Sequence, residues 1–230
     1  MPSPLLFLAA LPAAFVAYSP AAHLLPFAIR RGPADRRAIA LTFDDGPDAI
    51  WTPRILERLD RYGAKATFFL VGERARACPE VVKGIVAAGH EIGAHGFRHR
   101  NLWWCSPRRT GEEIRHGVEV LEELTGRPVR DFRPPWGMVN LSVYPWLARI
   151  GLRCVLWSIQ PEGLRPRAPE LQAAYVLRRA HPGAIVDLHD APGLTGAPAR
   201  THAALPAILD GLRQRGYAPV SLVSLFDAGP

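Results

Sequence analysis

The sequence is poor in cysteine and in lysine, and each shortage excludes a class of protein. Its 230 residues include three cysteines, and no two of them form a C-x-x-C pair. A zinc site built mainly from cysteine is therefore excluded, and at most one internal disulfide can form. Lysine occurs only as Lys65 and Lys83, so the formal charge of +7 rests on arginines dispersed along the chain. Because no nucleic-acid-binding motif accompanies these arginines, we expect no nucleic-acid partner.

Repeats and low-complexity tracts are also missing. The 23 prolines and 20 glycines are spread along the chain, and no segment recurs at a fixed period. Repeat architectures and long disordered linkers are thereby excluded. Hydrophobic residues make up 48% and charged residues 21% of the chain, as is typical of a globular protein with one buried core. We expect one catalytic domain over residues 38–226, acting as a monomer.

Charged residues are absent from the start of the chain. The uncharged run at residues 5–29 exceeds the roughly 20 apolar residues that a membrane-spanning helix needs. Prolines interrupt this run, and no basic region precedes it as in a secretory signal. We expect residues 1–32 to form a hydrophobic N-terminal segment that associates with a membrane or the cell envelope. A hydrophobic arm packed on the barrel or on a partner is the alternative. The arginines that follow the run favour a domain on the cytoplasmic side, which conflicts with action on the envelope, so the orientation stays open.

Short apolar segments alternate with amphipathic segments after residue 33. Strands separated by helices of this kind predict an α/β fold with a mainly parallel sheet and right-handed crossovers. Their number suits a distorted (β/α)7-type barrel, in which the chemistry collects at the carboxyl ends of the strands. Strands are predicted at 38–43, 66–71, 91–94, 153–158, 184–188 and 217–220, and helices at 52–61, 79–88, 109–124, 168–180 and 201–215.

Two adjacent carboxylates and a pair of histidines each follow a predicted strand. Asp44 and Asp45 point in different directions, so one can bind a cation while the other accepts a proton. His95 and His99 are four residues apart, and one helical turn would bring both imidazoles to one ion. A carboxylate with two histidines leaves a position open for water, as catalytic zinc sites require. An acidic turn and two surface histidines are the alternatives.

His189 ends another apolar strand and is a candidate general acid near neutral pH. Strand periodicity places Asp187 on the same side, where its charge would raise the pKa of the imidazole. A structural histidine, hydrogen-bonded in the core, is the alternative.

The order of these motifs resembles that of the NodB-homology polysaccharide deacetylases, carbohydrate esterase family 4. The resemblance runs from Ala38 to Leu225. It implies a hydrolase that removes N-acetyl groups from an amino-sugar polymer or oligomer, such as peptidoglycan or chitin. It also implies a divalent metal ion, with Zn2+ expected first and Co2+ or Ni2+ as alternatives. The matching blocks are T-F-D-D-G-P at 42–47, H-G-F-R-H at 95–99, R-P-P-W-G at 133–137 and L-H-D at 188–190.

The resemblance also implies a role for each matched residue. Asp44 would be the catalytic base, tethered by Arg133, and His189 the catalytic acid. The metal ligands would be Asp45, His95 and His99, and the substrate would contact Pro135, Trp136, Trp157 and Leu188.

Two departures from the family pattern bear on activity. Gly96 stands where the family has Ser or Thr, so a hydroxyl is missing from the loop between the ligands. The aspartates of the fourth motif are absent after Trp157, where Gln160 and Gly163 stand instead. The family's aspartate orients the catalytic histidine, and our hypothesis gives that task to Asp187.

The changes leave open two alternatives: an amidase acting on a non-sugar C–N bond, or an inactive glycan-binding module. A paired-carboxylate glycosidase is disfavoured, because adjacent acids cannot face each other across about 5–9 Å.

Overall fold

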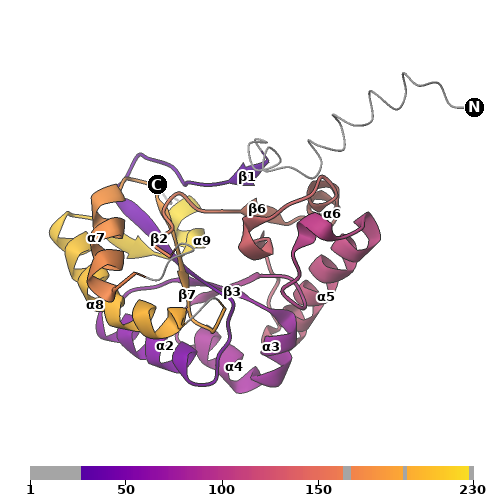
Figure 1. Ribbon diagram of the computed structural model, residues 1–230, viewed down its shortest axis with the longest axis horizontal. Helices are drawn as coiled ribbons and strands as arrows, with labels where there is room; N and C mark the ends of the chain where they lie inside the picture. Colours follow the sequence, from indigo (N-terminus) through magenta and orange to yellow (C-terminus); the bar gives the residue numbers. More distant parts are fainter. Residues whose placement is uncertain (1–26, 163–166, 194–195, 228–230) are drawn as a thin grey trace, which may run out of the picture.

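A curved sheet of parallel strands lies at the centre of the molecule, with helices around it (Figure 1). The computed structural model describes residues 27–162, 167–193 and 196–227. The strands follow the order β1-β6-β5-β4-β3-β2-β7, and β8 pairs with the start of β2. Their bounds are β1 Ala28–Ile29, β2 Ala38–Asp44, β3 Thr67–Leu70, β4 Glu91–Ala94, β5 Asp131–Phe132, β6 Arg153–Val155, β7 Ile185–His189 and β8 Ala218–Val220.

The sheet curls back on itself beyond β6. Ile159 forms a parallel bridge with Val186 of β7, and the backbone N–H groups of Ser158 and Ile159 donate to the carbonyl of Ile185 at 3.0 and 3.1 Å. The chain after β6 thus lies against β7, the last strand at the opposite end of the strand order. The predicted α/β fold with a distorted, mainly parallel barrel is confirmed.

Within the described residues, five longer helices match those predicted from the sequence, and three short α-helices were not predicted. The short helices have five to seven residues, too few to show a helical period in the sequence. The predicted helices are α2 Trp51–Arg61, α4 Pro79–Ala87, α5 Pro107–Thr125, α7 Pro169–Arg179 and α8 Ala197–Gln214, and the unpredicted ones are α3 Gly72–Ala77, α6 Val143–Arg149 and α9 Leu222–Phe226.

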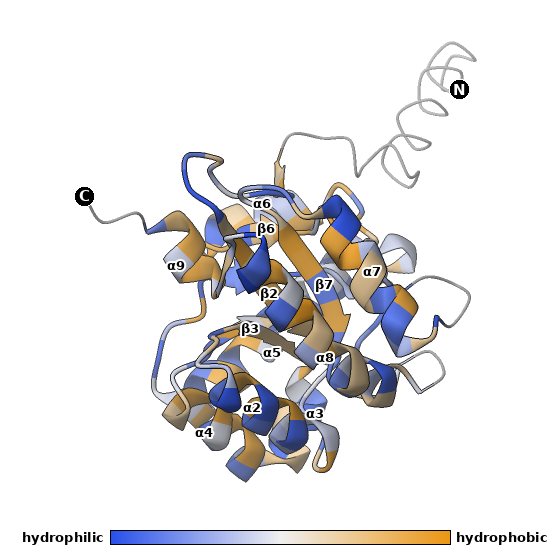
Figure 2. Cartoon of the chain, turned by 90° about the vertical axis from the view of Figure 1, so that its left-hand side faces the viewer, coloured by the Kyte–Doolittle hydropathy of each residue, from blue (hydrophilic) through white to orange (hydrophobic). Residues whose placement is uncertain are grey.

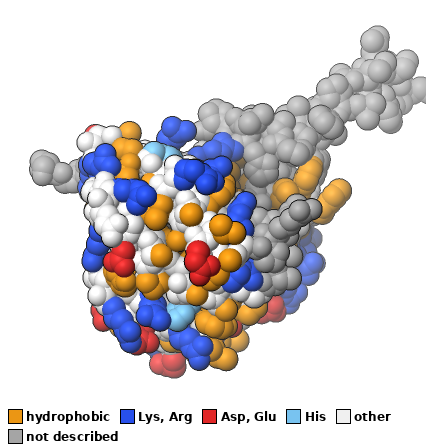
Figure 3. All heavy atoms as spheres, turned by 60° about the vertical axis from the view of Figure 1, so that its left-hand side comes forward, with side chains coloured by type: hydrophobic (Ala, Val, Ile, Leu, Met, Phe, Trp, Pro, Cys, Tyr) orange, Lys and Arg blue, Asp and Glu red, His pale blue; other side chains and the backbone are white. Residues whose placement is uncertain are grey.

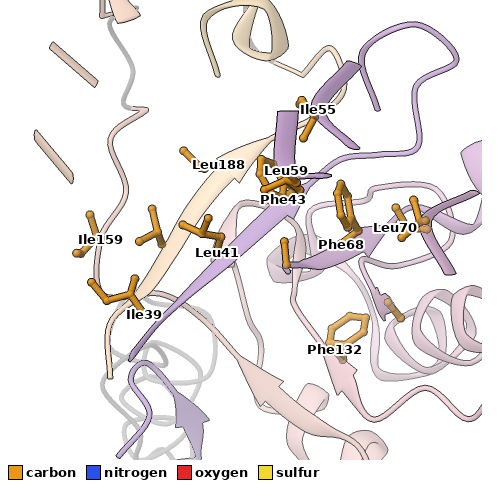
Figure 4. Packing of buried hydrophobic residues seen from close by; sticks show 14 of the residues in the cluster. Ile39, Leu41, Phe43, Ile55, Leu59, Phe68, Leu70, Phe132, Ile159 and Leu188 are labelled. Atoms are coloured by element: carbon orange, nitrogen blue, oxygen red, sulfur yellow. The ribbon is translucent and has the colours of Figure 1, made fainter. Parts of the chain in front are cut away.

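Strand β2 is buried on both faces, and its two faces have different roles. Leu41 and Phe43 point toward the helices, and the Phe43 ring stacks on Phe68 with 5.0 Å between centroids (Figure 4). In Figure 2 the central strands are coloured mostly as hydrophobic, whereas α2 on the outside of the molecule carries hydrophilic residues as well. Because strand side chains alternate, Thr42 and Asp44 point into the barrel. The same packing that fixes β2 thus directs Asp44 to the interior.

Strand β7 alternates in the same way. Asp187 and His189 share the interior face, as the strand period predicts. Leu188 is fully buried in the cluster that faces the helices (Figure 4). The prediction that Leu188 contacts substrate is therefore wrong, because this side chain is on the opposite face of the strand from His189.

The first described residues belong to the sheet. Within the predicted N-terminal segment, β1 pairs with β6, and Gly32 N–H donates to the Gly183 carbonyl at 2.7 Å. Residues 5–26 of the expected membrane-associated run lie outside the described residues. Within the described ranges, no helix has the length and apolar character needed to cross a membrane. Basic side chains on the face in Figure 3 are scattered among hydrophobic and neutral ones.

Candidate active site

The turn after β2 directs two neighbouring carboxylates to different partners. Asp44 ends the strand, and Asp45 has a left-handed backbone with φ 73°. Asp44 Oδ1 accepts a hydrogen bond from Arg133 Nη1 at 2.7 Å, whereas Asp45 faces the two histidines. Behind the turn, the fully buried Asp190 accepts a hydrogen bond from the Thr52 hydroxyl. The two adjacent carboxylates therefore have different partners, and their separate chemical roles stay a prediction.

Asp45, His95 and His99 form a compact set of three metal-ligating side chains. Asp45 Oδ1 lies 2.8 Å from His99 Nε2 and 3.5 Å from His95 Nε2, and one ligand atom from each residue lies within 4.8 Å of the others. The Nδ1 atom of His95 lies 2.7 Å from the Arg133 carbonyl oxygen, which can only accept. This contact places the proton on Nδ1 and leaves the Nε2 lone pair free for a cation.

The charge state of Asp45 also suits a cation. Burial raises the pKa of this carboxyl, but the neighbouring His95 and His99 imidazoles outweigh burial and hold the pKa well below its usual range. The carboxylate is thus ionised across the physiological pH range. One anionic oxygen and two imidazoles are donors that suit a borderline divalent ion such as zinc, so the residues fit the metal that the sequence predicts.

The segment between the two histidines is a loop, so the predicted helical turn is wrong. Gly96 and His99 have left-handed φ angles of 79° and 53°, which a helix excludes. The loop is held from two sides. The Glu113 carboxylate accepts from the N–H groups of Phe97 and Arg98 at 3.2 and 2.8 Å, and the N–H groups of residues 72 and 73 donate to loop carbonyls at 3.0 and 2.9 Å. These contacts hold the loop in place although position 96 has no hydroxyl.

A glycine in α5 allows the helix to approach this loop. A Cβ atom at Gly117 would lie 2.8 Å from the backbone C and O of Gly96. We expect Gly117→Ala to displace the loop, weaken metal binding by about tenfold or more and lower the midpoint of thermal unfolding. Gly84 of α4 is the matched control, because a Cβ there meets nothing within 4 Å. Gly84→Ala should be neutral or should stabilise the helix by up to about 1 kcal/mol. Metal titration and thermal unfolding of both variants test this, and equal effects would contradict it.

Arg133 is fully buried and holds the interior face of the barrel together. Besides Asp44, its Nη1 atom donates to the Thr42 hydroxyl at 2.8 Å and lies 3.5 Å from Asp187 Oδ1. Its other nitrogens donate to the carbonyls of Val155 and Leu156 at 3.3 and 3.0 Å. The guanidinium therefore has a fixed position, and it fixes the Asp44 carboxylate in turn.

His189 lies beside Asp44 across the β2–β7 pair, but its partner is not the predicted one. The Nδ1 atom of His189 is in hydrogen-bonding contact with Glu162 Oε2. Asp187 instead accepts from Gln160 Nε2 at 3.1 Å and faces Arg133. The hypothesis that Asp187 orients His189 by direct contact is therefore wrong. Sequence reasoning missed Glu162, although it is an acid in the very segment where the family's aspartates are absent.

The surroundings of His189 favour its charged form. Burial lowers the pKa of the imidazole, but the Glu162 hydrogen bond and the charge of Asp187 outweigh it, and the pKa is raised well above the ordinary value. Burial and the nearby Asp44 charge raise the pKa of Asp187 to about 7. The raised pKa of the imidazole opposite Asp44 favours the protonated form, which a general acid requires.

One aromatic ring of the third motif is exposed at the site. The Trp136 ring lies 4.2 Å from the His99 ring between centroids, and 47% of the residue is exposed. Pro135 is buried beside it. Trp157 is partly buried and packs against the backbone next to Trp136. A Cβ atom at Gly137 would lie 2.8 Å from the Trp157 ring. Of the predicted substrate contacts, Trp136 is the exposed one, whereas Pro135 and Leu188 are buried and Trp157 is partly buried.

Known proteins are similar to this chain in sequence. The family model named polysaccharide deacetylase matches residues 31–155. A peptidoglycan-N-acetylglucosamine deacetylase of Bacillus cereus is 35% identical over 195 residues, covering 84% of this chain and 90% of the relative. A chitooligosaccharide deacetylase of Azorhizobium caulinodans is 35% identical over 197 residues, covering 80% of this chain and 92% of the relative.

Solved structures agree with the sequence comparison. A peptidoglycan N-acetylglucosamine deacetylase in complex with 4-naphthalen-1-yl-N-oxidanyl-benzamide superposes with a TM-score of 0.82 and 33% identity, covering 87% of this chain and 93% of that chain. A CE4 family pseudoenzyme of Bacillus anthracis superposes with a TM-score of 0.81 and 28% identity, covering 88% of this chain and 70% of that chain. From its motifs, its barrel and these relatives, the chain belongs to the polysaccharide deacetylase family.

Proposed function

We propose that the chain is a metal-dependent N-deacetylase that hydrolyses acetamido groups of an amino-sugar polymer or oligomer, of the peptidoglycan or chitin type. The observation that carries this proposal is the Asp45–His95–His99 ligand set with Asp44 and His189 beside it. The names of the relatives supply the substrate class, since both act on N-acetylated amino sugars. A pseudoenzyme in the family shows that the fold alone does not ensure activity, so the intact side chains support the hydrolase.

Their geometry supports the proposed roles of Asp44 and Arg133. Asp45, His95 and His99 would hold the divalent cation, which would supply Lewis-acid chemistry for polarising a carbonyl group and acidifying water. Asp44, positioned by Arg133 at 2.7 Å, accepts the proton of the attacking water through its other oxygen, Oδ2. Because the guanidinium holds the carboxylate in one orientation, the base is aligned before the substrate arrives.

His189 completes the reaction at the leaving nitrogen. The amine leaves poorly unless it is protonated, and the imidazolium of His189 donates that proton. The bond between the carbonyl carbon and nitrogen breaks, so acetate and a free amino sugar are the products. Trp136 supplies an exposed ring against which a sugar ring packs.

The remaining assignments are finer proposals. We propose Zn2+ as the ion, with Co2+ or Ni2+ able to replace it, because two imidazoles and one carboxylate suit borderline metals. We also propose that the enzyme acts as a monomer. A peptidoglycan substrate would place the enzyme at the cell envelope, and association through residues 5–29 rests on their uncharged sequence.

Acetate release from a panel of N-acetylated amino sugars tests the proposal. We expect release from glucosamine-containing oligomers, loss of release after treatment with a chelator, and recovery when Zn2+ is added back. A panel of non-sugar acetamides run in parallel identifies the related amidase. Release that survives complete removal of metal would contradict the proposed chemistry.

The pH dependence of turnover tests the role of His189. The acid acts only while protonated, so its contribution is present below its pKa and is lost as the pH rises through it. Because that pKa is raised, we expect the alkaline limb of kcat to lie well above pH 6.5, the ordinary histidine value. An alkaline limb below that value would contradict the assignment.

A further inference from the structure

Glu162 connects His189 to two helices on the outside of the barrel. One carboxylate oxygen, Oε2, meets His189 Nδ1. The other, Oε1, accepts a hydrogen bond from the Thr201 hydroxyl of α8 at 2.7 Å and a longer one from Gln172 Nε2 of α7 at 3.5 Å. The Glu162 side chain is 9% exposed, so these contacts are largely shielded from water.

We propose that Glu162 is the positioning residue for the catalytic acid, in place of the aspartate that the fourth motif of the family normally supplies. This inference rests on the proposed function, in which His189 protonates the leaving nitrogen. Glu162 does not touch the substrate and acts through the imidazole ring.

The two ends of the Glu162 carboxylate explain how it positions the ring. Thr201 and Gln172 hold Oε1, so Oε2 has one direction in which to point, and His189 Nδ1 lies there. A carboxylate accepts the Nδ1 proton and so fixes both the rotation of the ring and its tautomer. The proton to be transferred then resides on Nε2, the ring nitrogen that is not engaged with Glu162.

Other nearby acids do not have this geometry. The oxygens of Asp187 face Gln160 and Arg133. Asp190 accepts from Thr52 behind the β2 turn. The contribution of Asp187 to His189 is therefore its charge, whereas the orienting contact belongs to Glu162.

The first test is spectroscopic and does not depend on turnover. In the full-length protein, nitrogen–proton NMR of the His189 ring, assigned by its absence in His189→Ala, should show a protonated Nδ1 in a strong hydrogen bond. Glu162→Gln keeps the size of the side chain but replaces the carboxylate, and we expect this signal to be lost or strongly shifted. Glu170→Gln, an exposed residue of α7, should leave it unchanged. An unprotonated Nδ1 in the wild type, or an unchanged signal in Glu162→Gln, would overturn the proposal.

The second test separates positioning from folding. We expect Glu162→Gln to lower kcat for acetate release by about 10- to 100-fold, the range seen when an orienting partner is lost. KM, metal content and the thermal midpoint should stay near wild type. Thr201→Val, which removes the anchor of Oε1, should lower kcat in the same direction by a smaller factor. A loss confined to KM or metal content, or no loss at all, overturns the proposal. A wild type that releases no acetate while the NMR signal responds would instead overturn the proposed function.

Discussion

Replacing Asp44 with asparagine is expected to lower kcat for acetate release by about 10²- to 10⁴-fold, the usual contribution of a general base. Asparagine has the same shape but cannot take up a proton from water. Its neighbours in the turn and strand stay in place, because β2 pairs along its length with β3 and β7. KM and metal content should therefore change little, and the effect should appear in turnover.

The stability of Asp44→Asn needs its own measurement. Arg133 is fully buried, and it loses the charge nearest to it when Asp44 is neutralised. Its carbonyl partners and Asp187 at 3.5 Å remain, so we expect a lower thermal midpoint but a folded chain. Asp60→Asn, on the exposed side of α2, is the matched control and should keep both activity and stability. Full turnover in Asp44→Asn would show that another group is the base.

Replacing His95 with alanine is expected to weaken binding of the divalent ion by more than about a hundredfold. Loss of a group that orients a metal ligand lowers metal affinity by about 10- to 100-fold. His95 is proposed to be a ligand itself, so its loss should have a larger effect. The residue is 2% exposed and lies 3.5 Å from Asp45 Oδ1. With two donors left, the ion would dissociate during dialysis, and acetate release should fall to background.

Metal content after dialysis, measured by elemental analysis, is the direct readout of this variant. His181→Ala is the control, because His181 follows α7 and hydrogen-bonds to the neighbouring Pro182 carbonyl. It should retain one ion per chain. If His95→Ala retained one equivalent of metal with wild-type affinity, the three-residue site would be refuted.

The sequence predicted the fold well where the hydrophobic pattern is strong. Strands β2 and β7 are mostly apolar and end in the polar residues Asp44 and His189, so both strands and their polar ends could be predicted directly. The short helices α3, α6 and α9 were missed because five to seven residues carry no periodic signal. The closure of the barrel through Ile159 was also invisible, because it depends on the pairing of segments far apart in the chain.

The sequence predicted the members of the site better than their geometry. His95 and His99 do meet Asp45, yet they do so on a loop with two left-handed residues, because Glu113 and the start of α3 hold the backbone there. A spacing of four fits a helix and such a loop equally. Tertiary contact decides between them.

The partner of His189 shows a second limit. Strand periodicity placed Asp187 on the correct face, but a shared face does not specify a hydrogen bond. Asp187 is drawn to Arg133, whereas Glu162 reaches the imidazole from the segment after β6. No periodic pattern links positions 162 and 189, so only the folded chain reveals the pair.

The location of the bound ion tests the central claim most directly. Crystals of the wild-type protein loaded with Zn2+ should give one strong anomalous difference peak at the zinc edge, bounded by the Asp45 carboxylate and the imidazoles of His95 and His99. Asp44 and His189 should lie on either side of that peak without binding it. A peak at any other set of side chains, or no peak in crystals of protein that still releases acetate, would contradict the account.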